Sequence, residues 1–333
     1  MKNKRVKRYR NPSQRLNKWG LIFIIPFIVA FLLFQLYPIV NSFILAFTND
    51  NDVTIFGQGN LEQFNILSNF KLVICDSDYW HCYFNTIIIF AMNFVPQIVS
   101  ALFFAALFTS RRIRMRAKGF FQFVYFLPNI LTATTVAALF VVLLDRYKIY
   151  DDVHPGGPIY ELFVLLGMNP DVKLLNDPWA NRIVIAFIQF WMWFGNSMVV
   201  YVAGIKGISN EVFEAADLDG ANSLQIFFNI TLSILKPIML YSLITSLIGG
   251  LQMFDIPMML RGTPINIAGE TFEPSKTIAM YIYEYMTQRD YGIASAASII
   301  LFIFSLGLSI LMYFLFFKEK NHEKRVWKKV ARL

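Results

Sequence analysis

The sequence is poor in charged residues. Asp, Glu, Lys and Arg make up 16% of its 333 residues, whereas about a quarter is usual in soluble domains. Hydrophobic residues reach 56%, and the mean hydropathy is +0.49. This balance excludes a disordered chain and most soluble enzymes, and it is typical of a membrane protein.

Cysteine and histidine are also scarce. The two cysteines, Cys75 and Cys82, exclude a disulfide-rich module. In a helix they would lie about 10 Å apart, which is too far for a bond. We therefore expect two free thiols, while a bridge stays open if the segment is an extracellular loop. The histidines are far apart in the sequence, and metal-binding and P-loop motifs are absent. We expect no metal site, no nucleotide site and no catalytic residue in this chain.

Six long apolar stretches are present instead. Each has the length of about 20 residues that a helix needs to cross a bilayer. They cover residues 19–47, 84–108, 119–144, 183–205, 237–260 and 293–317. The sequence therefore predicts an all-α membrane protein with six transmembrane helices in one domain, residues 19–317.

Basic residues gather in alternate connections. Residues 1–18 carry basic side chains and no acid, residues 111–118 are rich in arginine, and residues 318–333 are mostly basic. Lys206 and Lys236 flank another connection on the same side. Because positive loops stay in the cytosol, this pattern predicts two cytosolic tails, 1–18 and 318–333, in a multi-pass protein. We interpret the tail charge as contact with membrane lipid and not with nucleic acid.

The connection 206–236 is too polar to span the membrane and too patterned for a loose loop. Ser209 or Asn210 can cap a short helix from Glu211 to Leu218. Gly220 then permits a sharp turn before a second helix. Two helices joined at a glycine form a protrusion that a cytosolic partner can bind. The alternative is an amphipathic hairpin that lies on the membrane without a partner.

The stretch EAADLDGANSLQIFFNITLSILKP, from Glu214 to Pro237, resembles the EAA loop of binding-protein-dependent ABC importer permeases. In that motif EAA is followed by three residues, a glycine, nine residues and I-x-L-P. Here Gly220, Ile230 and Leu232 are in register, and Ser233 replaces the proline. Residues 69–86, 203–209, 254–264 and 281–298 also resemble this family, so the similarity runs from the first span to the sixth.

The resemblance implies the type I ABC importer permease fold and a subunit of a sugar importer in the cytoplasmic membrane. Its partners would be a second permease subunit in a heterodimer, a cytosolic ATPase dimer and an extracytoplasmic sugar-binding protein. ATP and Mg²⁺ would bind the ATPase, so this chain would hold no cofactor and would not be an enzyme. The EAA loop would be the coupling helix, with contact residues Glu214, Ala215, Ala216, Asp217 and Gly220.

A sugar pathway is expected near mid-membrane, where amides and aromatic rings meet hydroxyls and flat sugar faces. Gln189, Trp193 and Asn196 in the fourth span follow helical spacing on one face, and by position they match pocket sites of maltose-type permeases. The remaining candidates are Met192 beside them, and Ser246, Gly249, Gly250, Met253 and Asp255 in the fifth span. Asn129, Thr132 and Thr135 in the third span are weaker candidates.

Several alternatives stay open. Trp193 could pack inside the bundle, and Gly249 with Gly250 could serve helix packing. Asp255 could accept sugar hydroxyls, or it could reach outer water or a partner subunit. No converging cations are visible in the spans, which favours a neutral sugar, and the aromatic content suits an oligosaccharide. The competing functions are a membrane scaffold and a secondary transporter, although scarce intramembrane charge disfavours a proton-driven one.

Overall fold

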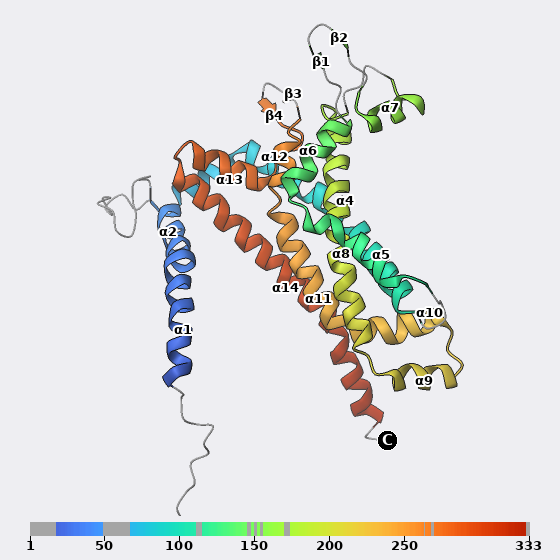
Figure 1. Ribbon diagram of the computed structural model, residues 1–333. Helices are drawn as coiled ribbons and strands as arrows, with labels where there is room; N and C mark the ends of the chain where they lie inside the picture. Colours follow the sequence, from blue (N-terminus) through green and yellow to red (C-terminus); the bar gives the residue numbers. More distant parts are fainter. Residues whose placement is uncertain are drawn as a thin grey trace, which may run out of the picture.

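Apolar helices dominate the computed structural model of the chain (Figure 1). The structure describes residues 18–48, 67–110, 115–144, 148–149, 152–153, 156–169, 174–262, 264–267 and 270–330. The predicted N-terminal tail therefore lies almost entirely outside the described residues. Helix α14 runs from Tyr291 to Val330 and includes most of the predicted C-terminal tail, residues 318–333.

Five of the predicted spans are continuous apolar stretches of membrane length. The first comprises α1 (Lys18–Phe31), a π-helical turn η2 (Leu32–Leu36) and α2 (Tyr37–Ala46). The second is α4 (Ser77–Thr109), and the fourth is α8 (Pro178–Lys206). The fifth comprises α10 (Ser223–Gln225), η4 (Ile226–Thr231), α11 (Leu232–Leu251) and α12 (Asp255–Met259). The sixth is the apolar part of α14, Tyr291–Phe316.

The third predicted span, residues 119–144, is a broken one that consists of two helices. Helix α5 (Lys118–Ile130) and helix α6 (Ala133–Leu144) meet at an angle of 92°. The helix stops because Leu131 adopts an extended conformation. Thr132 then accepts a hydrogen bond from the Thr135 backbone at 3.3 Å, as a capping residue does. Hydropathy predicts the apolar length of the span but contains no information about this bend.

Capping residues set the starts of the two central helices. The Asp76 carboxylate accepts a hydrogen bond from Asp78 N at 2.9 Å and begins α4. Asp177 accepts hydrogen bonds from the backbone at Trp179 and Ala180, with Pro178 in the first turn, and begins α8. Both helices therefore start at fixed points on the same side of the bundle.

Helices α4 and α8 form the centre of the bundle, flanked by α5 and α11. Three apolar clusters follow α4 from its beginning to its end, around Tyr79, Ile89 and Ala101. Gly195 allows the closest approach of α8 to α5, because a Cβ at this position would lie 2.0 Å from the Tyr125 carbonyl oxygen. The inward faces of α4 and α8 are therefore filled by packing, so only their other faces can line a sugar pathway.

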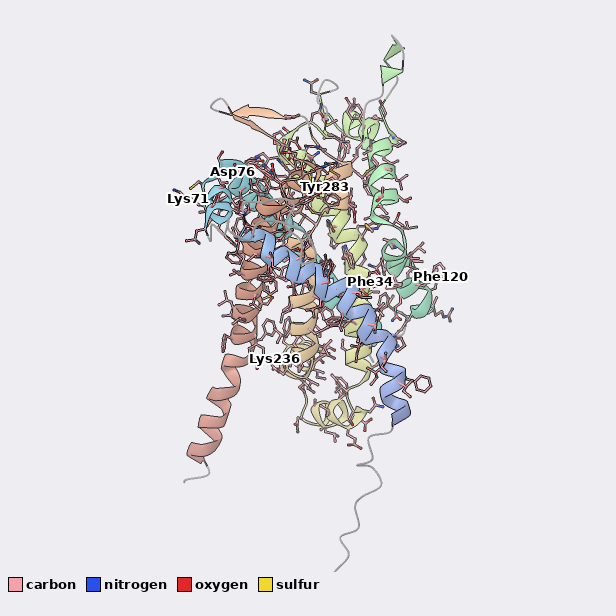
Figure 2. All side chains as sticks on the ribbon, turned by 90° about the vertical axis from the view of Figure 1, so that its left-hand side faces the viewer. Phe34, Lys71, Asp76, Phe120, Lys236 and Tyr283 are labelled. Atoms are coloured by element: carbon pink, nitrogen blue, oxygen red, sulfur yellow. The ribbon has the colours of Figure 1, made fainter. Side chains whose placement is uncertain are left out.

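The first span stands apart from this bundle (Figure 1). It crosses in front of the other helices in the view of Figure 2, where Phe34 is labelled on it. Phe34 is 81% exposed, and the most apolar window of this span contains no buried residue. Its α2 segment packs against α14.

Short elements cover the end of the bundle opposite α9 (Asn210–Leu218) (Figure 1). They are α3 (Ser68–Cys75), α7 (Pro158–Leu165), α13 (Ile278–Thr287), and the two-stranded hairpins β1–β2 (Lys148–Ile149, Asp152–Val153) and β3–β4 (Ile265–Ile267, Glu270–Phe272). Both hairpins are antiparallel and too short to change the all-α class. Cys75 ends α3 and Cys82 lies in α4, and both are free thiols as predicted.

Candidate functional site

A polar and aromatic face runs along α8. Trp193 is 48% exposed, Asn196 is exposed and Gln189 is partly exposed, while Met192, Phe194 and Gly195 between them are buried. The predicted shared face of these three side chains is therefore present in the structure. The alternative, in which Trp193 packs inside the bundle, does not describe the isolated chain.

A matching face lies on α11. Tyr241, Thr245, Gly249 and Gln252 are exposed at successive turns of the helix. Ser246 is partly exposed at the edge of this row. Helices α8 and α11, which carry these two faces, are in contact.

Gln97 of α4 forms hydrogen bonds to both α8 and α11. Its buried amide nitrogen donates hydrogen bonds to Ser197 Oγ at 3.0 Å and to Ser246 Oγ at 3.2 Å. Ser197 follows Asn196 on α8, and Ser246 follows Thr245 on α11. Gln97 and Ser197 were not predicted from the sequence, although an amide within an apolar span is a signal for a hydrogen bond between helices. We call Gln97, Ser197 and Ser246 the polar joint.

The predicted glycine pair has two different environments. At Gly250, a Cβ would lie 2.1 Å from the ring of Phe90, so this glycine serves the packing of α11 against α4. At Gly249, a Cβ would have no neighbour within 4 Å. Only Gly249 is therefore open on the candidate face.

The two predicted methionines do not lie on this face. Met192 and Met253 are each 4% exposed and pack in the apolar cluster around Ile89. Asp255 lies late in the fifth span, Ser223–Met259, and is exposed in the first turn of α12, after α11 ends at Leu251.

The break in the third span collects further polar groups. Thr132 and Thr135 are exposed, and their hydroxyl oxygens lie 2.7 Å apart. Asn129 is partly exposed one turn before the break. The weaker candidates of the sequence thus gather where the backbone leaves the helical path.

The EAA segment forms the helix and turn that its sequence predicts. Ser209 caps α9 by accepting a hydrogen bond from Glu211 N at 3.3 Å. Gly220 has a φ of +77°, with Gly220 N bonded to the Asp217 carbonyl and Ala221 N to the Ala216 carbonyl. These two bonds form a Schellman motif, which ends a helix rigidly.

Part of the surface of α9 packs against the protein, and the rest is exposed. Ala216 is buried, whereas Glu214, Ala215 and Asp217 are exposed. Leu218, at the end of the helix, is 89% exposed. An apolar residue beside acidic ones on a protruding helix is typical of a protein contact surface.

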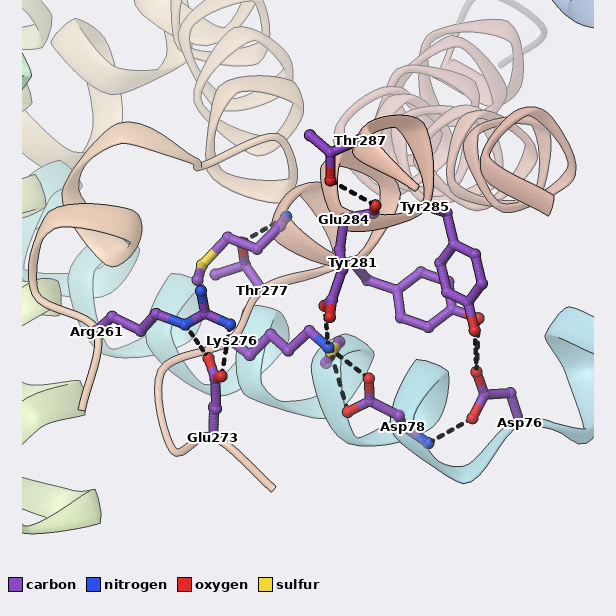
Figure 3. A network of polar contacts seen from close by, with 12 residues as sticks. Asp76, Asp78, Arg261, Glu273, Lys276, Thr277, Tyr281, Glu284, Tyr285 and Thr287 are labelled. Atoms are coloured by element: carbon purple, nitrogen blue, oxygen red, sulfur yellow. Dashed lines mark hydrogen bonds and ion pairs between the residues drawn. The ribbon is translucent and has the colours of Figure 1, made fainter. Parts of the chain in front are cut away.

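Polar contacts hold the opposite end of the bundle together (Figure 3). Lys276 Nζ lies 2.6 Å from carboxylate oxygens of both Asp78 and Glu284, which links α4 to α13. Burial alone would lower the pKa of Lys276, but these two partners outweigh burial and raise it above the ordinary value. Arg182 of α8 donates hydrogen bonds to Asn85 Oδ1, the shorter at 2.7 Å. The residues that the structure describes contain no group of three metal-binding side chains.

The apolar helices and the bundle that they form define a multi-span membrane protein. A family described as "Binding-protein-dependent transport system inner membrane component" matches residues 97–320. This match covers more than half of the chain, and the chain belongs to that family. The predicted recognition and transport class are confirmed.

The chain matches known permease proteins over nearly their whole length. The lactose transport system permease protein LacF of Rhizobium radiobacter is 27% identical over 306 residues, which cover 91% of this chain and 95% of LacF. The arabinooligosaccharides transport system permease protein AraP of Bacillus subtilis is 28% identical, covering 87% of this chain and 86% of AraP. The trehalose/maltose permease protein MalF of Thermococcus litoralis is 26% identical, covering 88% and 92%.

Solved structures share the fold. A bacterial ABC transporter involved in the import of the acidic polysaccharide alginate contains a chain with a TM-score of 0.70 and 21% identity, covering 90% of this chain and 96% of that one. A structure of the alginate transporter in complex with its pentasaccharide-bound periplasmic protein gives a TM-score of 0.68 at 22% identity, covering 89% and 93%. The predicted ABC importer permease fold is confirmed.

Proposed function

We propose that the chain is one transmembrane subunit of an ATP-driven importer that carries a neutral oligosaccharide across the cytoplasmic membrane by alternating access. The observation that carries this proposal is the position of α9 in the chain. Helix α9 connects α8 to the α10–η4–α11 helix. The protruding helix is thus joined directly to both spans that bear the candidate face.

The chemistry of the face supports a neutral sugar. Gln189 and Asn196 offer amide donors and acceptors, and Trp193 offers a flat apolar surface, the combination that sugars need. Neither α8 between Gln189 and Ile205 nor α11 between Pro237 and Leu251 contains a charged residue. The names of the lactose, arabinooligosaccharide and trehalose/maltose relatives support the same substrate class.

The coupling step follows from the connections of α9. ATP and Mg²⁺ bind the partner ATPase, and closure of the ATPase dimer moves α9 as a rigid unit, because both of its ends are capped. Three residues separate α9 from α8, and the first, Gly207, continues the helix through a hydrogen bond to the Ala203 carbonyl at 3.1 Å. A displacement of α9 therefore reaches α8, and the polar joint transmits it to α11.

The proposed partners correspond to surfaces of the chain. The separated first span supports a second permease subunit, which would cover the side of the bundle that this span faces. Exposed Leu218 with Glu214 and Asp217 supports an ATPase cleft that receives α9. The outer helices and hairpins support an extracytoplasmic sugar-binding protein. Both termini are proposed to be cytosolic, because α1 begins and α14 ends toward the end of the bundle that carries α9 (Figure 1).

The test is purification of the tagged chain from its native membrane in mild detergent, followed by reconstitution. We expect recovery of an ATPase, a second multi-span protein and a sugar-binding protein. ATP hydrolysis should rise when the sugar-loaded binding protein is added. Recovery of the chain alone, with sugar uptake driven by an ion gradient in the absence of ATP, would instead establish a secondary transporter.

A further inference from the structure

A pocket of about 830 Å³ lies at the end of the bundle opposite α9. Its walls come from one side of α3, from α13 and from the first turn of α14. The lining residues on which the argument depends are Ser68, Lys71, Cys75, Asp76, Tyr285 and Ile293. None of them belongs to the candidate face or to α9, so the pocket is a separate site.

The pocket lies at the level where two spans meet the membrane surface. Ile293 is in the first turn of the sixth span, Tyr291–Phe316. Helix α3 is tied to the end of the first span, because Asn69 donates hydrogen bonds to the carbonyls of Ala46 at 3.2 Å and Thr48 at 2.8 Å. Both observations place α3 at the outer boundary of the bilayer.

The residues around α3 fit this boundary. Trp80 has an exposed ring, and its indole N–H donates to the Ile74 carbonyl at 2.8 Å. Tryptophan held in this way is typical of the membrane–water interface. Leu67, Leu72 and Ile74 are exposed on or beside α3, as expected for a short helix whose apolar side chains contact lipid.

The pocket presents two opposite charges that do not neutralise each other. Lys71 is exposed, and within the described part of the chain no carboxylate lies within 4 Å of its ammonium group. Asp76 is held in place because Tyr281 donates to Asp76 Oδ2 at 2.6 Å and Tyr285 at 3.5 Å (Figure 3). Burial raises the pKa of Tyr281, and its bond to Asp76 raises it further, so the donor stays protonated. Lys71 and Asp76 lie at the same corner of the molecule (Figure 2).

We propose that this pocket binds the headgroup of a zwitterionic aminophospholipid, such as phosphatidylethanolamine, from the outer leaflet. The lipid phosphate contacts the Lys71 ammonium and the Ser68 hydroxyl. The lipid ammonium donates to the Asp76 carboxylate, and the acyl chains pass Ile293 toward the bilayer. A separated cation and anion beside apolar side chains match this headgroup, whereas an anionic lipid would offer no cation to Asp76 and would bring like charges together.

Cys75 allows a direct measurement of occupancy. It is the exposed cysteine of the pocket, whereas Cys82 is buried. The full chain is placed in nanodiscs of phosphatidylglycerol alone, or mixed with phosphatidylethanolamine or phosphatidylcholine, and labelled with N-ethylmaleimide. We expect phosphatidylethanolamine to slow labelling about tenfold relative to the other two membranes, the scale of one hydrogen bond to a charged group.

The variants test the assignment of the charges. Lys71→Gln should abolish the slowing by phosphatidylethanolamine, and native mass spectrometry should show loss of the retained lipid. Arg289→Gln removes an exposed cation between α13 and α14 that does not line the pocket, and it should behave as the wild type. Equal labelling in all three membranes would overturn the proposal. Equal protection by soluble glycerophosphoethanolamine in phosphatidylglycerol nanodiscs would also overturn it, because the ligand would then not be a membrane lipid. This test is independent of transport and of the ATPase.

Discussion

The Gln97 amide nitrogen of α4 lies 3.2 Å from the Ser246 hydroxyl oxygen of α11. The same nitrogen also donates to Ser197 of α8. One side chain therefore connects three spans, and it does so directly behind the two exposed faces. We expect the spacing of those faces to depend on it.

Gln97→Leu should lower both stability and transport. The change keeps the approximate volume and removes two interhelical hydrogen bonds, at a cost of about 1 kcal/mol within a membrane. We expect a lower melting temperature of the purified complex and a lower yield of sugar transported per ATP hydrolysed. Gln122→Leu is the matched control, because Gln122 of α5 makes no side-chain hydrogen bond with the described residues. If both variants have equal effects, the polar joint has no specific role in stability or transport.

Trp193→Ala should weaken sugar uptake with little change in stability. The ring is half exposed, so its removal creates no cavity in the core, but it removes an apolar surface for the sugar. Phe187→Ala is the control, because Phe187 is 49% exposed on a different side of α8. Uptake measured over a range of sugar concentrations should fall for Trp193→Ala alone. If uptake by the Trp193→Ala variant is normal, Trp193 does not contact the sugar and its role is packing against a partner.

Glu214→Lys should separate ATP hydrolysis from transport. The substitution reverses the charge on the exposed surface of α9 and should repel a basic cleft, while α9 itself stays folded because its caps are unchanged. We expect the complex to insert normally and to transport at a small fraction of the wild-type rate. A second variant, Gly220→Ala, strains the turn by about 1 kcal/mol through its positive φ. Gly220→Asn should be tolerated better than Gly220→Ala. Unchanged transport in the Glu214→Lys variant would contradict the coupling role.

Gly250→Ala should destabilise the protein, whereas Gly249→Ala should not. The new methyl group at position 250 meets the Phe90 ring and forces a shift that costs about 1 kcal/mol or more. The methyl group at position 249 meets nothing and occupies the candidate face. Thermal unfolding should therefore separate the two variants. Phe90→Leu should restore stability to Gly250→Ala; failure of this rescue would mean that the contact is not the cause.

Lys276→Met should destabilise the outer end of the bundle. Loss of the cation leaves Asp78 and Glu284 close together, at a cost of about 2 kcal/mol, below that of a fully buried pair because both acids are partly exposed. Lys276→Arg should retain most of the stability.

The pH dependence of this contribution has a definite sign. The pKa of Lys276 is raised in the folded protein, so its stabilising effect is complete below the ordinary value of 10.5 and is lost as the pH rises through the higher folded value. The difference in melting temperature between wild type and Lys276→Met should therefore be constant near neutral pH and shrink in strong alkali. A difference that already shrinks below 10.5 would contradict the raised pKa.

Local patterns predicted much of this molecule. Apolar length located the spans, and Ser209 and Gly220 located the ends of α9, because caps and turns depend on neighbouring residues. The break after Ile130 was not predictable, since the apolar pattern continues through it. The polar joint and the ion pair between Lys276 and Asp78 join residues that are about 100 to 200 positions apart in the chain. The burial of a residue on α8 also depends on contacts with residues distant in the chain, so sequence alone did not distinguish exposed Trp193 from buried Met192.

The position of the first span has a consequence for biogenesis. This span precedes α14 in the sequence, and its α2 segment packs against α14. During synthesis α2 therefore lacks this neighbour until the intervening spans have been made. A chain truncated before α14 would leave the packing surface of α2 uncovered.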